Sequence, residues 1–282
     1  ATHNSNAATE DGYLNGYQTV GIVPQLEDGV RGLLIDVYWG LETDSGLIVT
    51  DRAPVTPEHR AELVDEVGES AVAAAEELAA QYTDAGGEPQ MYLCHAFCEI
   101  GAGLFVPELV RIREWLQANP REVVVFIIQD EGPQPDDFAA AFEQSGMLDL
   151  VLTPEGDDWP TLGEMIDSGR RVLVTAENVS GGGHDWYLPA FEVVQDTPFK
   201  FATVDEFTCE LYRGEADSPM FLVNHWLSPV AASKADVANQ ADVLRGRLDQ
   251  CTERGTPTMI AVDFHDRGEL LEIVDELNGV SG

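Results

Sequence analysis

The sequence has little positive charge. Its 282 residues include 51 Asp and Glu but only 15 Lys and Arg, which gives a formal net charge of −36 at pH 7. Lys200 and Lys234 are the only lysines. A surface this acidic repels nucleic acid and anionic lipid alike. We therefore expect no nucleic-acid partner and a very soluble or salt-adapted protein, in which any anion site is built by local groups.

The chain also lacks long apolar runs and the common cofactor motifs. No apolar run approaches the length of a membrane span, and no Gly-x-Gly-x-x-Gly turn marks a dinucleotide site. Cysteines are few as well, at four in all. Cys94 and Cys98 bracket His95 too closely, and with too few other ligands, for a tetrahedral zinc site.

An even number of cysteines suggests disulfides and export. We expect the pairs Cys94–Cys98 and Cys209–Cys251, although four cysteines permit three pairings. No signal peptide is visible, so we expect that upstream residues were removed from a secreted protein.

Apolar segments of strand length alternate with helical patterns along the whole chain. Strands are expected at 29–39, 91–95, 123–129, 171–176, 220–223 and 258–262. Helices are expected at 57–82, 107–118, 136–144, 161–167, 235–253 and 269–277. The alternation predicts an α/β protein with one distorted TIM-type (β/α)8 barrel over 1–282, whose first strand, leading into His3, is truncated. An open doubly wound sheet is the alternative.

Polar side chains gather where these strands end. They are Asp36, His95, Asp130, Glu177, Asn224 and Asp263. In a parallel barrel the carboxyl ends of the strands meet on one face, where active sites lie. At the start of the chain, His3 and Asn4 place an imidazole beside an amide oxygen, which suits deprotonation of a hydroxyl close to a cation.

Each of these residues also has an ordinary structural interpretation. His95 could be a packed loop residue between its two cysteines. Asp36 and Asp130 could be helix caps or members of structural ion pairs. His225 follows Asn224 at a strand end, where an ordinary loop is as good an interpretation as a ligand contact.

Several ordered motifs resemble a known family. They are Thr2-His3-Asn4, Gly29-Val30-Arg31 before Asp36, Leu93-Cys94-His95, Asn119-Pro120-Arg121-Glu122 before Asp130, and the closing Val262-Asp263-Phe264. Together they resemble the X domain of phosphatidylinositol-specific phospholipases C, mainly from residue 1 to about 131. The resemblance implies a distorted TIM barrel that cleaves the glycerol–phosphate bond of inositol phospholipids.

The resemblance implies a role for each matching residue. His3 would be the base that takes the proton of the inositol 2-hydroxyl, and His95 the acid that protonates the departing diacylglycerol oxygen. Asp263 is expected to orient His3, as an acid orients its imidazole partner in a catalytic triad. Glu177 and His225 are candidate substrate-binding residues.

The resemblance is to the calcium-dependent bacterial type, in which Asn4, Asp36 and Asp130 would hold the ion. Oxygen-only ligands favour calcium or magnesium over zinc. Two departures stand out. The acid expected two residues before Asp36 is Leu34, for which Glu131 is a possible replacement, and the segment 41–89 is longer than usual and is interpreted as an insertion.

The sequence thus predicts a secreted, monomeric phosphodiesterase of the phospholipase C type, assisted by Ca²⁺, that acts on phosphatidylinositol or a related phosphodiester. We expect transient contact with a membrane surface. Trp186 and Tyr187 could form a lipid-facing rim or simply pack, and we favour the rim. A glycerophosphodiester phosphodiesterase is one alternative, although its usual His-Arg-Gly start is missing here. A catalytically silent barrel that binds lipid or carbohydrate is the other, and both histidines at strand ends argue against it.

Overall fold

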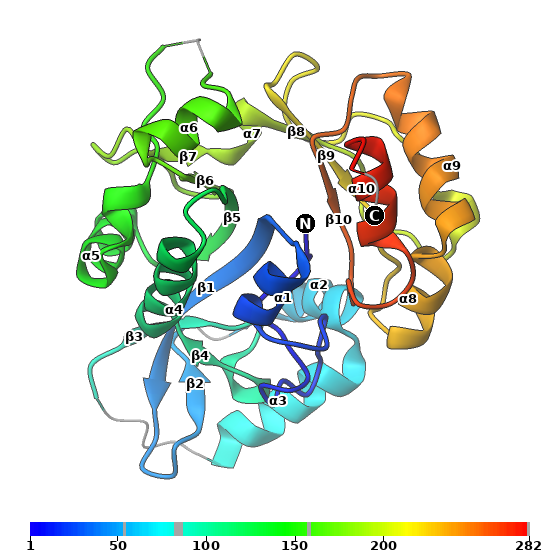
Figure 1. Ribbon diagram of the computed structural model, residues 1–282. Coiled ribbons are helices and arrows are strands. Elements are labelled where there is room, and N and C mark those ends of the chain that lie inside the picture. The colour runs from blue at the N-terminus through cyan, green and yellow to red at the C-terminus, as the bar shows by residue number, and fades with distance from the viewer. Residues whose placement is uncertain (53–54, 82–86, 157–158, 281–282) are drawn as a thin grey trace.

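Strands and helices alternate along the chain, as the sequence predicts (Figure 1). The computed structural model describes residues 1–52, 55–81, 87–156 and 159–280. The strands are β1 (Gly32–Glu42), β2 (Ile48–Thr50), β3 (Gln90–Leu93), β4 (Gly103–Leu104), β5 (Val124–Glu131), β6 (Val172–Ala176), β7 (Tyr187–Pro189), β8 (Val194–Asp196), β9 (Met220–Asn224) and β10 (Met259–Ala261).

Most helices lie between these strands. The α-helices are α1 (Ile22–Asp28), α2 (Pro57–Val67), α3 (Glu69–Gln81), α4 (Phe105–Ala118), α5 (Pro135–Ser145), α6 (Leu162–Ser168), α7 (Ala190–Val193), α8 (Ala232–Ala238), α9 (Ala241–Thr252) and α10 (Leu270–Leu277). Short 3₁₀ helices are η1 (Cys98–Ile100), η2 (Met147–Leu150) and η3 (Val204–Glu206). None of the helices in the described ranges has the length and apolar character needed to cross a bilayer.

Two sheets form the centre of the molecule. The larger has the order β4-β3-β1-β5-β6-β7, with β2 also paired to β1, and the smaller has the order β10-β9-β8. Neighbouring strands from β1 through β5 and β6 to β7 are parallel, as are all strands of the smaller sheet. Thr2 joins the two sheets through parallel bridges to Leu33 and Val262. The result is a mixed α/β fold with a mostly parallel central sheet.

The expected closed barrel is not formed by the described residues. No ladder joins β7 to β8. Arg213 spans this opening instead, with hydrogen bonds to Glu177, just past β6, and to Asp196, at the end of β8. The expected first strand is reduced to the bridge at Thr2. Two partners hold that short segment, because Thr2 N–H donates to Gly32 O and His3 N–H donates to Val262 O.

The strand before His95 runs against its expected direction. Leu93 pairs with Val37 and Gln90 with Gly40, so β3 is antiparallel to β1. The eleven-residue strand β1 extends well past Asp36, and β3 folds back along this extension. Cys94 N–H then donates to Asp36 O. His95 therefore reaches the same place as Asp36 by a return path, not from a parallel neighbour.

The segment 41–89 contains β2 and a pair of helices. The helix expected over 57–82 is broken at Gly68, whose φ of 89° ends α2 before α3 begins; its expected last residue lies outside the described residues. Apolar residues of both helices pack on the chain that follows His95. This cluster contains Leu63, Val67, Val72, Ala75, Ala96, Phe97 and Ile100. The helical pair thus supports the His95 loop.

The prediction of a lipid-facing rim at Trp186 and Tyr187 is wrong. Both side chains are buried. Tyr187 begins β7, and its ring stacks on Phe138, while Trp186 packs against Phe142. An aromatic pair after a glycine-rich loop resembles an exposed tip in the sequence, but here it closes the core between α5 and the sheet.

Candidate active site

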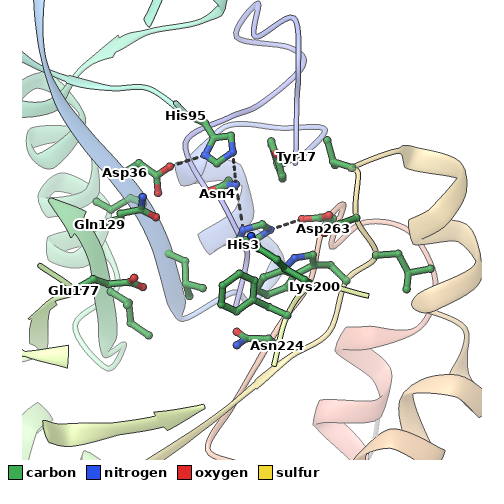
Figure 2. Close-up of a pocket in the computed structure, with 18 of the residues that line it drawn as sticks. His3, Asn4, Tyr17, Asp36, His95, Gln129, Glu177, Lys200, Asn224 and Asp263 are labelled. Carbon is green, nitrogen blue, oxygen red and sulfur yellow. Dashed lines mark hydrogen bonds and ion pairs between the residues drawn. The ribbon is translucent and has the colours of Figure 1, made fainter. Parts of the chain in front are cut away.

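One cavity of about 290 Å³ lies where the parallel strands end. Figure 2 shows side chains from both sheets pointing into it. Of the residues singled out in the sequence as candidates for a functional role, those that line the cavity are His3, Asn4, Asp36, His95, Glu177, Asn224 and Asp263. The cavity thus joins the start of the chain, β1, the His95 loop, β6, β9 and the turn after β10.

The two imidazoles have matching surroundings. His3 Nδ1 is 2.8 Å from Asp263 Oδ1, and His95 Nδ1 is 2.6 Å from Asp36 Oδ2. The Nε2 atoms of both rings point toward Asn4, whose amide nitrogen is 3.2 Å from His3 and 3.4 Å from His95. When a carboxylate accepts the Nδ1 proton, Nε2 becomes the atom that exchanges a proton with a ligand. Two proton-transfer groups therefore meet at one point.

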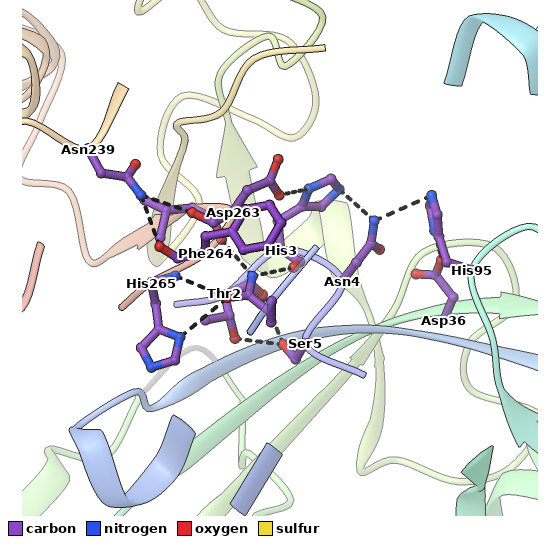
Figure 3. A network of polar contacts seen from close by, with 12 residues as sticks. Thr2, His3, Asn4, Ser5, Asp36, His95, Asn239, Asp263, Phe264 and His265 are labelled. Atoms are coloured by element: carbon purple, nitrogen blue, oxygen red, sulfur yellow. Dashed lines mark hydrogen bonds and ion pairs between the residues drawn. The ribbon is translucent and has the colours of Figure 1, made fainter. Parts of the chain in front are cut away.

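Packing fixes the plane of the His3 ring. Trp226 stacks on it, with ring centroids 3.7 Å apart and planes 7° from parallel. Tyr17 contacts it edge-on. The amide of buried Gln18 donates to His3 O at 2.8 Å and to Val262 O at 3.0 Å. Val262 directly precedes Asp263, whose carboxylate pairs with the His3 ring (Figure 3). His3 and Asp263 are thus tied together through the backbone as well as through the side chains.

Three non-glycine residues among those described have a positive φ: Asn4 (45°), Ala96 (60°) and Phe264 (47°). Each directly follows a candidate catalytic residue, namely His3, His95 or Asp263. A left-handed conformation is uncommon for residues with a side chain, and it gathers at functional sites because the fold must hold it in place. The backbone therefore marks the same three positions as the side-chain geometry.

Burial changes the proton affinity of the acids in the cavity. It raises the pKa of Asp263, and the neighbouring His3 acts in the opposite direction. It also raises the pKa of Glu177 to about 7, against the pull of Arg213. Both carboxylates are therefore stabilised as anions mainly by their basic partners, His3 and Arg213.

Both expected disulfides are confirmed. Cys94 is bonded to Cys98, and Cys209 to Cys251. The first bond closes the short loop that carries His95. Thr50 braces the same loop, since its hydroxyl accepts from Cys98 N–H and donates to buried Glu99.

Asp130 does not join the cavity. It pairs with Val37 across β5 and β1, and Gln129 pairs with Asp36. Because side chains alternate along a strand, Gln129 faces the cavity with Asp36 while Asp130 faces away. The Asp130 carboxylate accepts the backbone N–H groups of residues 178 and 179, each at 2.8 Å. The prediction that Asp130 is a metal ligand is therefore corrected: its carboxylate caps the loop after β6.

His225 also lies outside the cavity. It is fully buried, and its Nε2 donates to Ala238 O at 2.8 Å. Burial lowers its pKa to about 4, so the ring is neutral. Its neighbour Asn224 faces the cavity instead, as alternation along β9 requires.

The side chains present do not fit a calcium ion. Calcium takes six to eight oxygen ligands, usually with several carboxylates. Asp36 is committed to His95 Nδ1 at 2.6 Å, and the amide nitrogen of Asn4 is directed at the imidazoles. Leu34 and Gln129 occupy the places where further acids would stand. Within the described ranges, no three or more His, Cys, Asp or Glu side chains converge as a metal site would require.

Sequence reasoning missed several residues that line the cavity. They are Tyr17, Gln129, Lys200, Arg213 and Trp226. Only Lys200 carried a usable signal, since a phosphate site in a chain with two lysines points to one of them. The others reach the cavity through loops or strand alternation, which composition does not reveal.

Comparisons with known proteins agree with this architecture. A family model described as PI-PLC X 1 matches residues 71–278. An uncharacterized secreted protein of Arthroderma benhamiae is 29% identical over 225 residues, which cover 68% of this chain and 51% of that protein. A PI-PLC X domain-containing protein 1 of the same fungus is 28% identical, over 67% of this chain and 69% of that protein.

More distant matches extend the comparison. A PI-PLC X domain-containing protein of Arabidopsis thaliana is 26% identical over 67% of this chain and 49% of its own length. The chain thus spans about half the length of two of these three relatives. Phosphatidylinositol-specific phospholipase C from Listeria monocytogenes shares the fold, with a TM-score of 0.52 at 15% identity over 94% of this chain and 86% of that one. Since the family model covers most of the chain, the chain belongs to the PI-PLC X family.

Proposed function

We propose that this protein is a phosphodiesterase of the phospholipase C type that cleaves the glycerol–phosphate bond of phosphatidylinositol or a related phosphodiester. One observation carries the proposal: two imidazoles, each backed by a carboxylate, meet at the Asn4 amide inside one cavity. Such a pair can remove one proton and supply another within a single displacement at phosphorus. The family membership supports the reaction class.

Following the family resemblance, we assign a distinct task to each histidine. His3 Nε2 takes the proton of the inositol 2-hydroxyl, whose oxygen attacks phosphorus. His95 Nε2 gives its proton to the glycerol oxygen as the phosphorus–oxygen bond breaks, which releases diacylglycerol and a cyclic phosphate. Asp263 stabilises the imidazolium that forms at His3, and Asp36 fixes the orientation of His95. One proton is taken and one is given, so the step balances.

We further propose that the protein is secreted and meets its lipid at a membrane surface. Two disulfides fit export, and one relative is named a secreted protein. Exposed Leu211 and Tyr212 lie next to Arg213 in the chain, and Tyr212 contacts the cavity residue Phe199 edge-on. These side chains replace the buried aromatic pair as the candidate lipid contact.

The experiment is to compare His3→Ala and His95→Ala with the native protein on a water-soluble phosphodiester and on phosphatidylinositol. Each variant should lose at least about a hundredfold in turnover while its thermal midpoint changes little. His184→Ala is the matched control, because His184 forms a similar ion pair with Asp136 outside the cavity. A native level of turnover in either active-site variant would remove that histidine from the mechanism.

A further inference from the structure

A phosphate group meets an unfavourable field in this cavity. The acids that line it are Asp36, Asp65, Glu177 and Asp263. The molecule around them carries 51 acidic side chains. Since the side chains present do not fit a calcium ion, an anionic substrate needs another positive charge within hydrogen-bond reach. Apart from the two imidazoles, the basic side chains that line the cavity are Lys200 and Arg213.

Arg213 is already neutralised by acidic partners. Its Nη1 donates to Glu177 at 3.0 Å, and its Nε and Nη2 donate to Asp196 at 2.9 and 2.6 Å. Its guanidinium also stacks over Phe191 and Phe199. Two carboxylates therefore use its donors, and the group serves to span the opening between β7 and β8.

Lys200 has no such partner. Within the described part of the chain, its ammonium makes no hydrogen bond and no ion pair, and the side chain is exposed at the cavity (Figure 2). The neighbours on both sides hold its backbone. Phe199 packs against Trp226, and Phe201 is buried, with its carbonyl accepting Ser228 N–H at 2.7 Å. Because the aromatic rings on both sides of Lys200 are held in place, its side chain can extend into the cavity without disturbing the rest of the loop.

We propose that Lys200 binds the phosphate of the substrate. Its ammonium supplies the positive charge that a calcium ion would otherwise provide, since the cavity lacks the ligands to hold that ion. The ammonium donates to a non-bridging phosphoryl oxygen and offsets the charge that develops there during displacement. This inference rests on the proposed function, because that function is what brings a phosphate into the cavity. It assigns the charge to a residue of this chain in place of a bound ion.

The first test measures phosphate binding at Lys200 and requires no turnover. The native protein is treated with a limiting amount of an amine-acetylating reagent, in inorganic phosphate or in sodium chloride of equal ionic strength, and acetylation is measured by peptide mass spectrometry. Lys200 should react about threefold or more slowly in phosphate, once phosphate exceeds its dissociation constant. Lys234, whose ammonium donates to Ser228 O, is the internal control and should not change. Unchanged labelling of Lys200, or equal slowing at both lysines, would overturn the proposal.

The second test measures the turnover of Lys200 variants. Lys200→Gln should lower kcat/KM by about tenfold to a hundredfold, Lys200→Arg should recover most of the loss, and Lys234→Gln should leave turnover unchanged. Excess chelator should not reduce native turnover. Turnover that chelator abolishes and calcium restores would contradict the assignment of the charge to Lys200. If no phosphodiester is cleaved at all, the proposed function fails, yet the labelling result still decides whether Lys200 binds phosphate.

Discussion

The amide of Asn4 lies between the two imidazoles of the cavity, 3.2 Å from His3 Nε2 and 3.4 Å from His95 Nε2. An amide nitrogen carries two N–H groups, so it can donate to each Nε2 atom while that atom is unprotonated. The arrangement holds the two Nε2 atoms close enough for the attacking hydroxyl and the leaving oxygen of one phosphodiester to reach them together. The orientation of both rings depends in turn on the carboxylates of Asp263 and Asp36.

Replacing either carboxylate by its amide should disable the adjacent histidine. Asp263→Asn and Asp36→Asn remove the acceptor for Nδ1–H and favour the wrong tautomer, so turnover should fall by about a hundredfold or more. The measurement is kcat on a soluble phosphodiester, with calcium and with chelator. Asp136→Asn is the control, because Asp136 binds His184 at the same 2.8 Å distance on the surface. Equal turnover in Asp263→Asn and the native protein would contradict the base assignment.

The sequence located most of these side chains but not the direction in which each one faces. It marked Asp36, His95 and Asp263 correctly as cavity residues. It misplaced Asp130, because shifting a strand by one residue exchanges its two faces. The apolar run of β5 is buried on both sides and has no polar alternation to show which face Asp130 takes. Gln129, and not Asp130, lines the cavity.

At the scale of elements, the two disulfides have different tasks. The bond between Cys94 and Cys98 closes a loop with a separation of four residues, and the other closes one of 42. In the chain-entropy account the long loop contributes roughly 3–4 kcal/mol and the short one roughly 2 kcal/mol. The short loop, however, holds His95 between β3 and η1. The bond of the long loop therefore contributes more to stability, and the bond of the short loop lies at the site.

Paired serine variants separate these tasks. Cys209→Ser with Cys251→Ser should lower the thermal midpoint substantially while leaving turnover intact below it. Cys94→Ser with Cys98→Ser should lower turnover more than it lowers the midpoint. The measurement is calorimetry and kcat on the same preparations. A large midpoint loss with native turnover in the second pair would show that the loop bond only stabilises the fold.

The elements also show where periodicity is informative. Apolar runs located the long strands β1, β5 and β6 within a few residues. They could not show that β3 runs antiparallel, because an isolated four-residue strand carries no information on its direction. Direction follows from the length of β1, which leaves room for β3 to fold back. The expected alternation of strands and helices had placed His95 and Asp36 on one face, but through a parallel strand and not through the antiparallel β3.

At the scale of the whole molecule, the charge of −36 should weaken the fold at low ionic strength. Salt screens repulsion between surface carboxylates over about 10 Å at 0.1 M, so the thermal midpoint should rise with sodium chloride. The measurement is a series of thermal scans from low to molar salt. A flat or falling midpoint would mean that the acids are locally compensated.

Buried acids should also make the fold more stable in mild acid. The pKa of Glu177 is raised from 4.5 to about 7, so the folded state binds more protons than the unfolded state between these values. This contribution to stability is present below about pH 4.5 and is lost as pH rises to about 7. Arg213, Asp36 and Asp196 face this carboxyl. The thermal midpoint of Glu177→Gln should therefore fall less than that of the native protein between pH 5 and 7.5; equal slopes would contradict the assignment.

The central claim is that His3 and His95 act together on a phosphodiester. The most direct measurement is phosphorus NMR of phosphatidylinositol in mixed micelles, followed over time with the native protein and with His95→Ala. With the native protein, the lipid phosphodiester signal should disappear and a cyclic inositol phosphate signal should take its place. With the variant, no such change should occur over the same period. A lipid signal that persists with the native protein, or that is lost equally fast with both proteins, would rule out joint action of the two histidines.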